Sequence, residues 1–136
     1  MARILIADDH EVVRKSLRSI LSQSESCDVC GEAKDGKEAL QQVNQLHPDL
    51  VILDYLMPEM NGLEAACEIR LAAPATKIVV LSMIDTPQME GATQLVGVDA
   101  FVPKSAGALD LLSTVRQVLN LGNESQLNEI PSPSPL

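Results

Sequence analysis

Residues 50–54 read Leu-Val-Ile-Leu-Asp, a run of large apolar residues that ends in a carboxylate. An apolar run without polar alternation is typical of a strand buried on both faces, as in a parallel sheet covered by helices. Further apolar runs occupy residues 4–7, 78–81 and 100–102, and a weaker one occupies residues 29–33. These five segments predict the strands of one parallel sheet.

Longer segments with apolar residues at helical spacing separate these runs. In the fourth of them, Thr86 and Pro87 are suited to the N-cap and the first helical position, and Gly97 to the C-terminal end. Strict alternation of strands and helices implies right-handed crossovers. We therefore expect the α/β class, a flavodoxin-like (βα)5 three-layer sandwich with a parallel five-stranded sheet of order 2-1-3-4-5.

The periodicity stops after Gly122. Residues 123–136 are polar and end in a Pro-Ser repeat, a composition typical of linkers. We expect one domain over residues 1–122 and a flexible linker or tail over residues 123–136.

Charge and cysteine content exclude several classes of protein. Ten Lys and Arg stand against nineteen Asp and Glu, a net charge of −9, so this segment is not expected to bind nucleic acid directly. Three cysteines do not make a disulfide framework. The sequence shows neither a signal-peptide pattern nor an apolar run that could span a membrane. A cytoplasmic protein with no membrane contact is the resulting expectation.

Polar residues follow four of the five predicted strands. Asp8 and Asp9 follow the first, Asp54 the third and Ser82 the fourth, and Lys104 comes shortly after the fifth. Ligands of open α/β sheets bind at the carboxyl ends of the strands, near the point where the strand order reverses. With order 2-1-3-4-5 these four strands are neighbours, so all five side chains should converge on one crevice.

Three converging carboxylates repel one another, and a single lysine does not neutralise them. A divalent cation does, and Mg²⁺ prefers oxygen ligands together with water and phosphate. A carboxylate can also accept a phosphoryl group, a transfer that needs mainly positioning and charge neutralisation. The residues thus predict a Mg²⁺ site that handles phosphate.

The motifs resemble the response-regulator receiver (CheY-like) family in order and spacing over residues 2–121. The matching segments are Asp8-Asp9, Leu53-Asp54, Met57-Pro58-Glu59-Met60-Asn61-Gly62, Ser82 and Phe101-Val102-Pro103-Lys104. The resemblance implies two-component signalling, in which a sensor histidine kinase phosphorylates Asp54.

The resemblance also assigns a role to each site residue. Asp9, Asp54 and the main-chain carbonyl of Leu56 would ligate Mg²⁺ directly, and Asp8 would contact it through water. Lys104 would pair with the phosphoryl group.

Ser82 and Phe101 match the switch pair of the family. The resemblance implies that Ser82 moves toward the phosphoryl group and that Phe101 turns inward into the space it leaves. A buried phenylalanine of the core would look the same in sequence.

The opening, from Asp8 to Arg18, resembles the subfamily with a LuxR-type helix-turn-helix output (NarL/FixJ-like). This implies control of transcription through a DNA-binding domain, which the 136 residues do not include. A receiver separated from its output at the linker is favoured over a stand-alone receiver. A phosphorylation-dependent homodimer is a further assembly consistent with the family.

Rival functions fit the residues less well. A phosphohydrolase of the haloacid dehalogenase type needs an acid two positions after its nucleophile, where this chain has Leu56. An electron carrier of the flavodoxin type needs a phosphate loop after the first strand, where Asp8 and Asp9 would repel the flavin phosphate. We therefore expect a phosphoacceptor and not an enzyme, with at most self-phosphotransfer from small donors and weak autodephosphorylation. A phosphorylation-independent interaction module remains the alternative.

Two smaller patterns have plain structural explanations. Asp8 and Asp9 taken alone would suit a helix cap. Cys27 and Cys30 have the spacing of half a zinc site, but no second ligand pair accompanies them, so a structural role is favoured.

Overall fold

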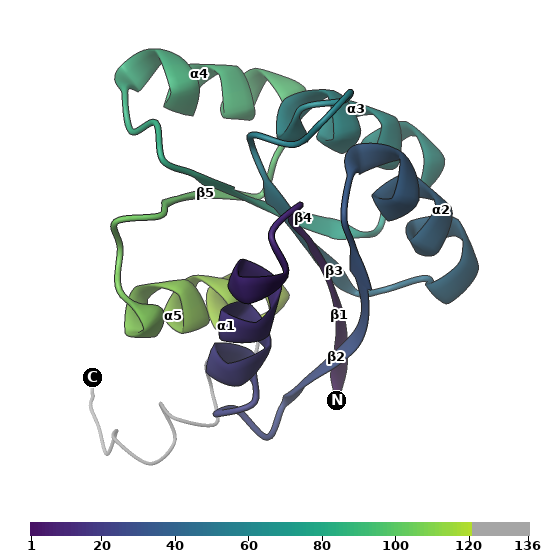
Figure 1. The fold of residues 1–136 in the computed structure, drawn as a ribbon, viewed down its shortest axis with the longest axis vertical. Coiled ribbons are helices and arrows are strands. Elements are labelled where there is room, and N and C mark those ends of the chain that lie inside the picture. The colour runs from purple at the N-terminus through teal and green to yellow at the C-terminus, as the bar shows by residue number, and fades with distance from the viewer. Residues whose placement is uncertain (121–136) are drawn as a thin grey trace, which may run out of the picture.

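A computed structural model describes residues 1–120, in which five strands alternate with five helices (Figure 1). The strands are β1 (Ala2–Ala7), β2 (Cys27–Ala33), β3 (Leu50–Asp54), β4 (Lys77–Ser82) and β5 (Ala100–Pro103). The helices are α1 (Glu11–Leu21), α2 (Gly36–Leu46), α3 (Gly62–Ala72), α4 (Pro87–Val96) and α5 (Ala108–Leu119). The predicted tail, residues 123–136, and the end of the predicted domain lie outside the described residues.

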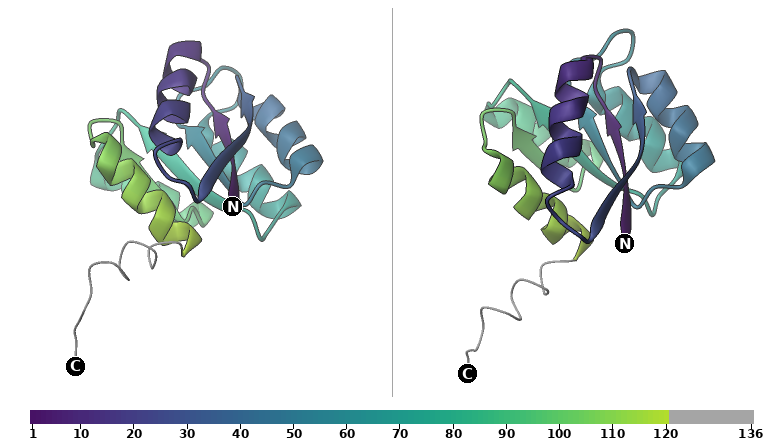
Figure 2. Two further views of the ribbon diagram at one scale, coloured as in Figure 1. Left: turned by 90° about the horizontal axis from the view of Figure 1, so that it is seen from below. Right: turned by 60° about the horizontal axis from the view of Figure 1, so that its bottom comes forward.

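The strands form one parallel sheet of order β2-β1-β3-β4-β5. Helices α1 and α5 cover one face, and α2, α3 and α4 cover the other, as Figures 1 and 2 show from different sides. The predicted flavodoxin-like three-layer sandwich and its strand order are confirmed. Within residues 1–120, no helix has the length and apolar character needed to cross a membrane.

Side chains alternate between the two faces of the sheet, as the pleat requires. In β1, Ile4 and Ile6 belong to the apolar cluster under α1 and α5, and Leu5 and Ala7 belong to the cluster under the other helices. All of β3 is buried, which explains its unbroken apolar sequence. The core thus packs against the strands up to the ends that carry the polar residues.

Helix α4 begins and ends where the sequence predicts. The Thr86 hydroxyl accepts a hydrogen bond from the main-chain N–H of Met89, and Pro87 occupies the first turn. Gly97 closes the helix with φ of 87°, a left-handed conformation that favours glycine.

Candidate functional site

Asp8, Asp54 and Lys104 meet at the carboxyl ends of β1, β3 and β5. Lys104 Nζ lies 3.0 Å from Asp54 Oδ1 and 3.3 Å from Asp8 Oδ2. Asp8 is 0% exposed and Asp54 4% exposed. The structure therefore brings together two buried carboxylates around one ammonium group, as the sequence predicts.

Burial dominates the electrostatics of this cluster. It raises the pKa of the Asp54 carboxyl above its usual value, the hydrogen bond from Lys104 opposes this, and the charge of Asp8 adds to the rise. Burial also disfavours the charge on Lys104, but the hydrogen bond and charge of Asp54 outweigh it and raise the pKa of the ammonium group. The raised pKa favours the charged form of the lysine, which contacts both acids.

Asp9 adds a third carboxylate beside this pair. Its Oδ1 lies 3.2 Å from His10 Nδ1, and yet this buried oxygen receives no hydrogen bond from the described residues. A buried carboxylate oxygen without a donor is costly unless a cation or a proton satisfies it. Three carboxylates with one lysine fit a divalent cation that prefers oxygen ligands.

Ser82 is buried at the end of β4, next to Lys104. The main-chain N–H of Lys104 donates to the Ser82 carbonyl at 2.7 Å, and the Ser82 hydroxyl accepts from the N–H of Ile84 at 2.9 Å. Phe101 in β5 is half-buried and packs against the core cluster on the side of α2, α3 and α4. The switch roles of both residues stay predictions.

The main chain of Tyr55 anchors the loop between β3 and α3 through two hydrogen bonds. The Tyr55 N–H donates to the Leu81 carbonyl at 2.8 Å, and the Gly62 N–H donates to the Tyr55 carbonyl at 2.7 Å. Asn61 caps α3 in a reciprocal arrangement with Glu64. Leu56 lies in this loop and is exposed. Its position after Asp54 is compatible with the predicted carbonyl ligand, which stays a prediction.

The alternative structural readings have clear outcomes. The N-cap of α1 is His10, which makes no side-chain cap. The Asp8 carboxylate accepts from the His10 N–H at 2.9 Å but also binds Lys104, so capping is not its sole role. Cys27 and Cys30 both lie in β2 and neither forms a disulfide.

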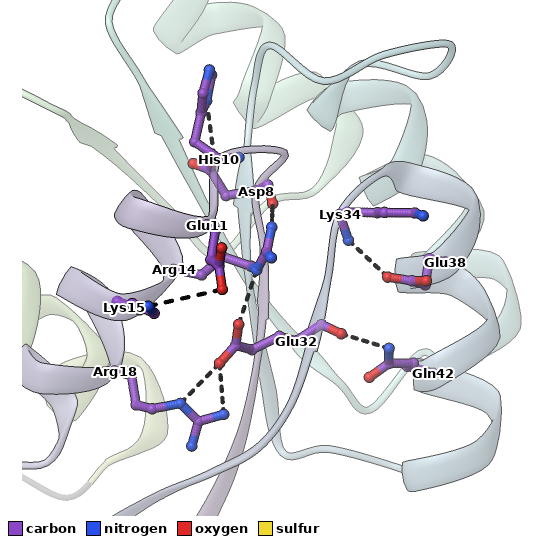
Figure 3. A network of polar contacts seen from close by, with 10 residues as sticks. All are labelled: Asp8, His10, Glu11, Arg14, Lys15, Arg18, Glu32, Lys34, Glu38 and Gln42. Carbon is purple, nitrogen blue, oxygen red and sulfur yellow. Dashed lines mark hydrogen bonds and ion pairs between the residues drawn. The ribbon is translucent and has the colours of Figure 1, made fainter.

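One residue at the site escaped the sequence analysis. Arg14 of α1 donates from Nη1 to the main-chain carbonyl of Asp8 at 2.8 Å and from Nε to Glu32 Oε1 at 2.9 Å (Figure 3). No motif signals this contact, because it depends on how α1 and β2 pack beside β1.

Comparisons with known proteins agree with this fold. The family model of the response regulator receiver domain matches residues 4–116. The response regulator protein VraR of Staphylococcus saprophyticus subsp. saprophyticus is 38% identical over 124 residues, which cover 90% of this chain and 58% of that protein. The chain thus spans little more than half the length of this curated relative.

Solved receiver structures are similar as well. The signal receiver domain of the putative response regulator NarL from Mycobacterium tuberculosis is 30% identical, with a TM-score of 0.83 over 88% of this chain and 96% of that one. A DNA-binding response regulator of the LuxR family from Staphylococcus aureus is 26% identical, with a TM-score of 0.82 over 88% of this chain and 100% of that one.

Proposed function

This chain belongs to the response regulator receiver domain family, akin to receivers of the NarL and LuxR type, and we propose that it accepts a phosphoryl group on Asp54. The observation that carries the proposal is the meeting of Lys104 with Asp54 and Asp8 at the carboxyl ends of β5, β3 and β1. Of the two carboxylates, Asp54 lies nearer to the Lys104 ammonium group, at 3.0 Å against 3.3 Å for Asp8.

In the proposed reaction, a carboxylate oxygen of Asp54 attacks the phosphorus of a phosphorylated histidine on a sensor kinase. The P–N bond breaks as the P–O bond forms, and the leaving imidazole takes up a proton. Lys104 would exchange its contact with the Asp54 carboxylate for a charge-assisted hydrogen bond to the phosphoryl oxygens. Phosphoryl transfer relies on such positioning and neutralisation more than on covalent help from the protein.

Asp9, Asp54 and the Leu56 carbonyl are the proposed direct ligands of Mg²⁺, with Asp8 acting through water. The bound cation would offset the negative charge that the carboxylates and phosphoryl group share. The buried Asp9 oxygen without a hydrogen-bond donor supports this assignment. The chain itself supplies no second cation among the described contacts of Asp54.

Signalling would pass through Ser82 and Phe101. A Ser82 hydroxyl drawn to the phosphoryl group would release the N–H of Ile84, at the start of the segment leading into α4. Phe101, which packs on the same side of the sheet as α4, would then turn inward. The phosphoryl group can shift the packing of Phe101 between its two states only to the extent that it interacts more favourably with one state than with the other.

Control of transcription is the output that the relatives suggest for the whole protein. A LuxR-family DNA-binding response regulator is among the similar structures. This chain matches 58% of the VraR protein, so DNA binding would belong to a further domain of the whole protein. A sensor histidine kinase as phosphodonor and a phosphorylation-dependent homodimer are the proposed partners.

Intact-mass spectrometry after incubation with acetyl phosphate and Mg²⁺ tests the acceptor. A single phosphoryl adduct should form on the wild type, require Mg²⁺ and be absent from Asp54→Asn. The matched control is Asp85→Asn, which changes an exposed aspartate in the loop after β4 and should leave the adduct intact. A folded wild type that gains no adduct would contradict the proposal and favour a phosphorylation-independent module.

A further inference from the structure

The main chain of Asp8 is held from two sides. Its N–H donates to the carbonyl of Ala33 in β2 at 3.0 Å, and its carbonyl accepts from Arg14 Nη1 in α1 at 2.8 Å. The carbonyl of Asp8 and the N–H of Asp9 belong to one planar peptide group. Arg14 therefore restrains the peptide from which the Asp9 side chain projects.

The guanidinium of Arg14 is itself fixed at its other end. Glu32 of β2 accepts from Arg14 Nε at 2.9 Å and, on its other oxygen, from Arg18 Nε at 2.8 Å (Figure 3). The Glu32 carbonyl accepts from Gln42 of α2 at 2.6 Å. The hydrogen bond from Arg18, followed by that from Arg14, keeps the pKa of Glu32 below its usual value.

We propose that Arg14 is a positioning residue for the divalent cation, holding the Asp8–Asp9 peptide so that the Asp9 carboxylate faces the site. This inference rests on the Mg²⁺-dependent function proposed above. Arg14 is 17% exposed, and its rigid fork reaches Asp8 and Glu32 together. Groups that orient metal ligands affect metal affinity although they do not touch the metal.

Positioning and simple electrostatics predict effects of opposite sign. Arg14 places a positive charge next to a cluster that should bind a cation, so loss of this charge alone would strengthen Mg²⁺ binding. Loss of the restraint on Asp9 would weaken it. The direction of the change therefore separates the two explanations.

Arg18 provides a matched control on the same helix. It binds the same carboxylate as Arg14, at 2.7 Å from Nη2 to Glu32 Oε2, and carries the same charge. Arg18 is 48% exposed, and its described hydrogen bonds go to Glu32 and not to Asp8. Replacement of Arg18 removes charge and a Glu32 contact but leaves the contact of Arg14 with the Asp8 carbonyl.

The test is the Mg²⁺ dissociation constant of the full chain, measured by isothermal titration calorimetry without phosphodonor. Arg14→Gln should weaken Mg²⁺ binding about tenfold, the lower end of the usual range for groups that orient metal ligands. Arg14→Lys keeps the charge but has one ammonium group in place of the two guanidinium nitrogens that bind Glu32 and the Asp8 carbonyl, so it should weaken binding as well. Arg18→Gln should bind Mg²⁺ as the wild type does.

Thermal unfolding of each variant accompanies the titration, and Arg14→Lys decides the question if Arg14→Gln does not fold. Equal affinities for the Arg14 and Arg18 variants, or tighter binding by Arg14→Gln, would overturn the inference while leaving the proposed function intact. A wild type that does not bind Mg²⁺ at all would overturn both. Weaker binding confined to the Arg14 variants establishes the positioning role.

Discussion

The carbonyl oxygen of Asp54 lies so close to Gly62 that a Cβ added to this glycine would stand 2.5 Å from it. The same Cβ would be 2.8 Å from Tyr55 Cα. Both neighbours are main-chain atoms, which do not move aside as a flexible side chain does. Gly62 therefore lets the start of α3 approach the end of β3, against the main chain of the proposed phosphoacceptor residue.

Gly62→Ala should lower the free energy of unfolding by about 2 kcal/mol, because overpacking forces the backbone to shift. Gly91→Ala in α4 is the matched control, since a Cβ there meets no heavy atom within 4 Å. That change should raise the free energy of unfolding by about 0.5–1 kcal/mol through helix propensity. Urea unfolding followed by circular dichroism measures both, and equal effects of the two substitutions would contradict the close-approach explanation.

Lys104→Met should destabilise the protein by about 3 kcal/mol near neutral pH, because it leaves two buried carboxylates without their cation. Added Mg²⁺ should recover more stability in this variant than in the wild type. Lys77→Met serves as control, since Lys77 is exposed at the start of β4 and should change stability little. Thermal unfolding with and without Mg²⁺ checks this, and an equal response of wild type and variant would count against it.

Asp54→Asn should be more stable than the wild type at pH 7 in the presence of a chelator. Burial first, and the charges of the neighbouring acids after it, raise the folded pKa of Asp54 above its ordinary value near 3.8. As pH rises above 3.8, the unfolded chain releases this proton before the folded one does, so wild-type stability falls. The advantage of the Asn variant should therefore shrink as pH falls toward 3.8.

Urea unfolding of both proteins between pH 4 and pH 7 measures this difference. If the difference in free energy of unfolding between the two proteins stayed constant across this pH range, Asp54 would not titrate as its burial implies.

Thr86→Ala should lower the free energy of unfolding by about 1 kcal/mol, because the N–H of Met89 loses its hydroxyl acceptor. Thr86→Ser keeps the acceptor and should retain most of the stability. Hydrogen exchange of the first-turn amides of α4 gives a local readout, and unchanged protection in Thr86→Ala would argue against the cap.

Much of the fold follows from local rules. Unbroken apolar runs identify β3 and β4 as buried strands, and Thr86, Pro87 and Gly97 bound α4. The strand order then brings together residues as far apart in sequence as Asp8 and Lys104. Convergence of this kind is predictable because parallel strands all end at the same edge of their sheet.

Long-range side-chain pairing is what the sequence does not reveal. Glu32 binds Arg14 and Arg18 across eighteen and fourteen residues, a choice made by the packing of α1 against β2. Arg70 likewise pairs with Asp99 across 29 residues, from α3 to the residue before β5. Many acid–base pairings are compatible with one composition, and only the tertiary arrangement selects among them.

The sheet divides the core into two apolar clusters, one beneath α1 and α5 and the other beneath α2, α3 and α4. A change of side-chain volume in one cluster can be compensated by its neighbours in the same cluster. The stability effects of substitutions in the two clusters should therefore be close to additive. Strands β1, β3, β4 and β5 each contribute side chains to both clusters. A substitution that shifts one of these strands therefore affects the packing of both clusters and the position of the polar residue at the end of that strand.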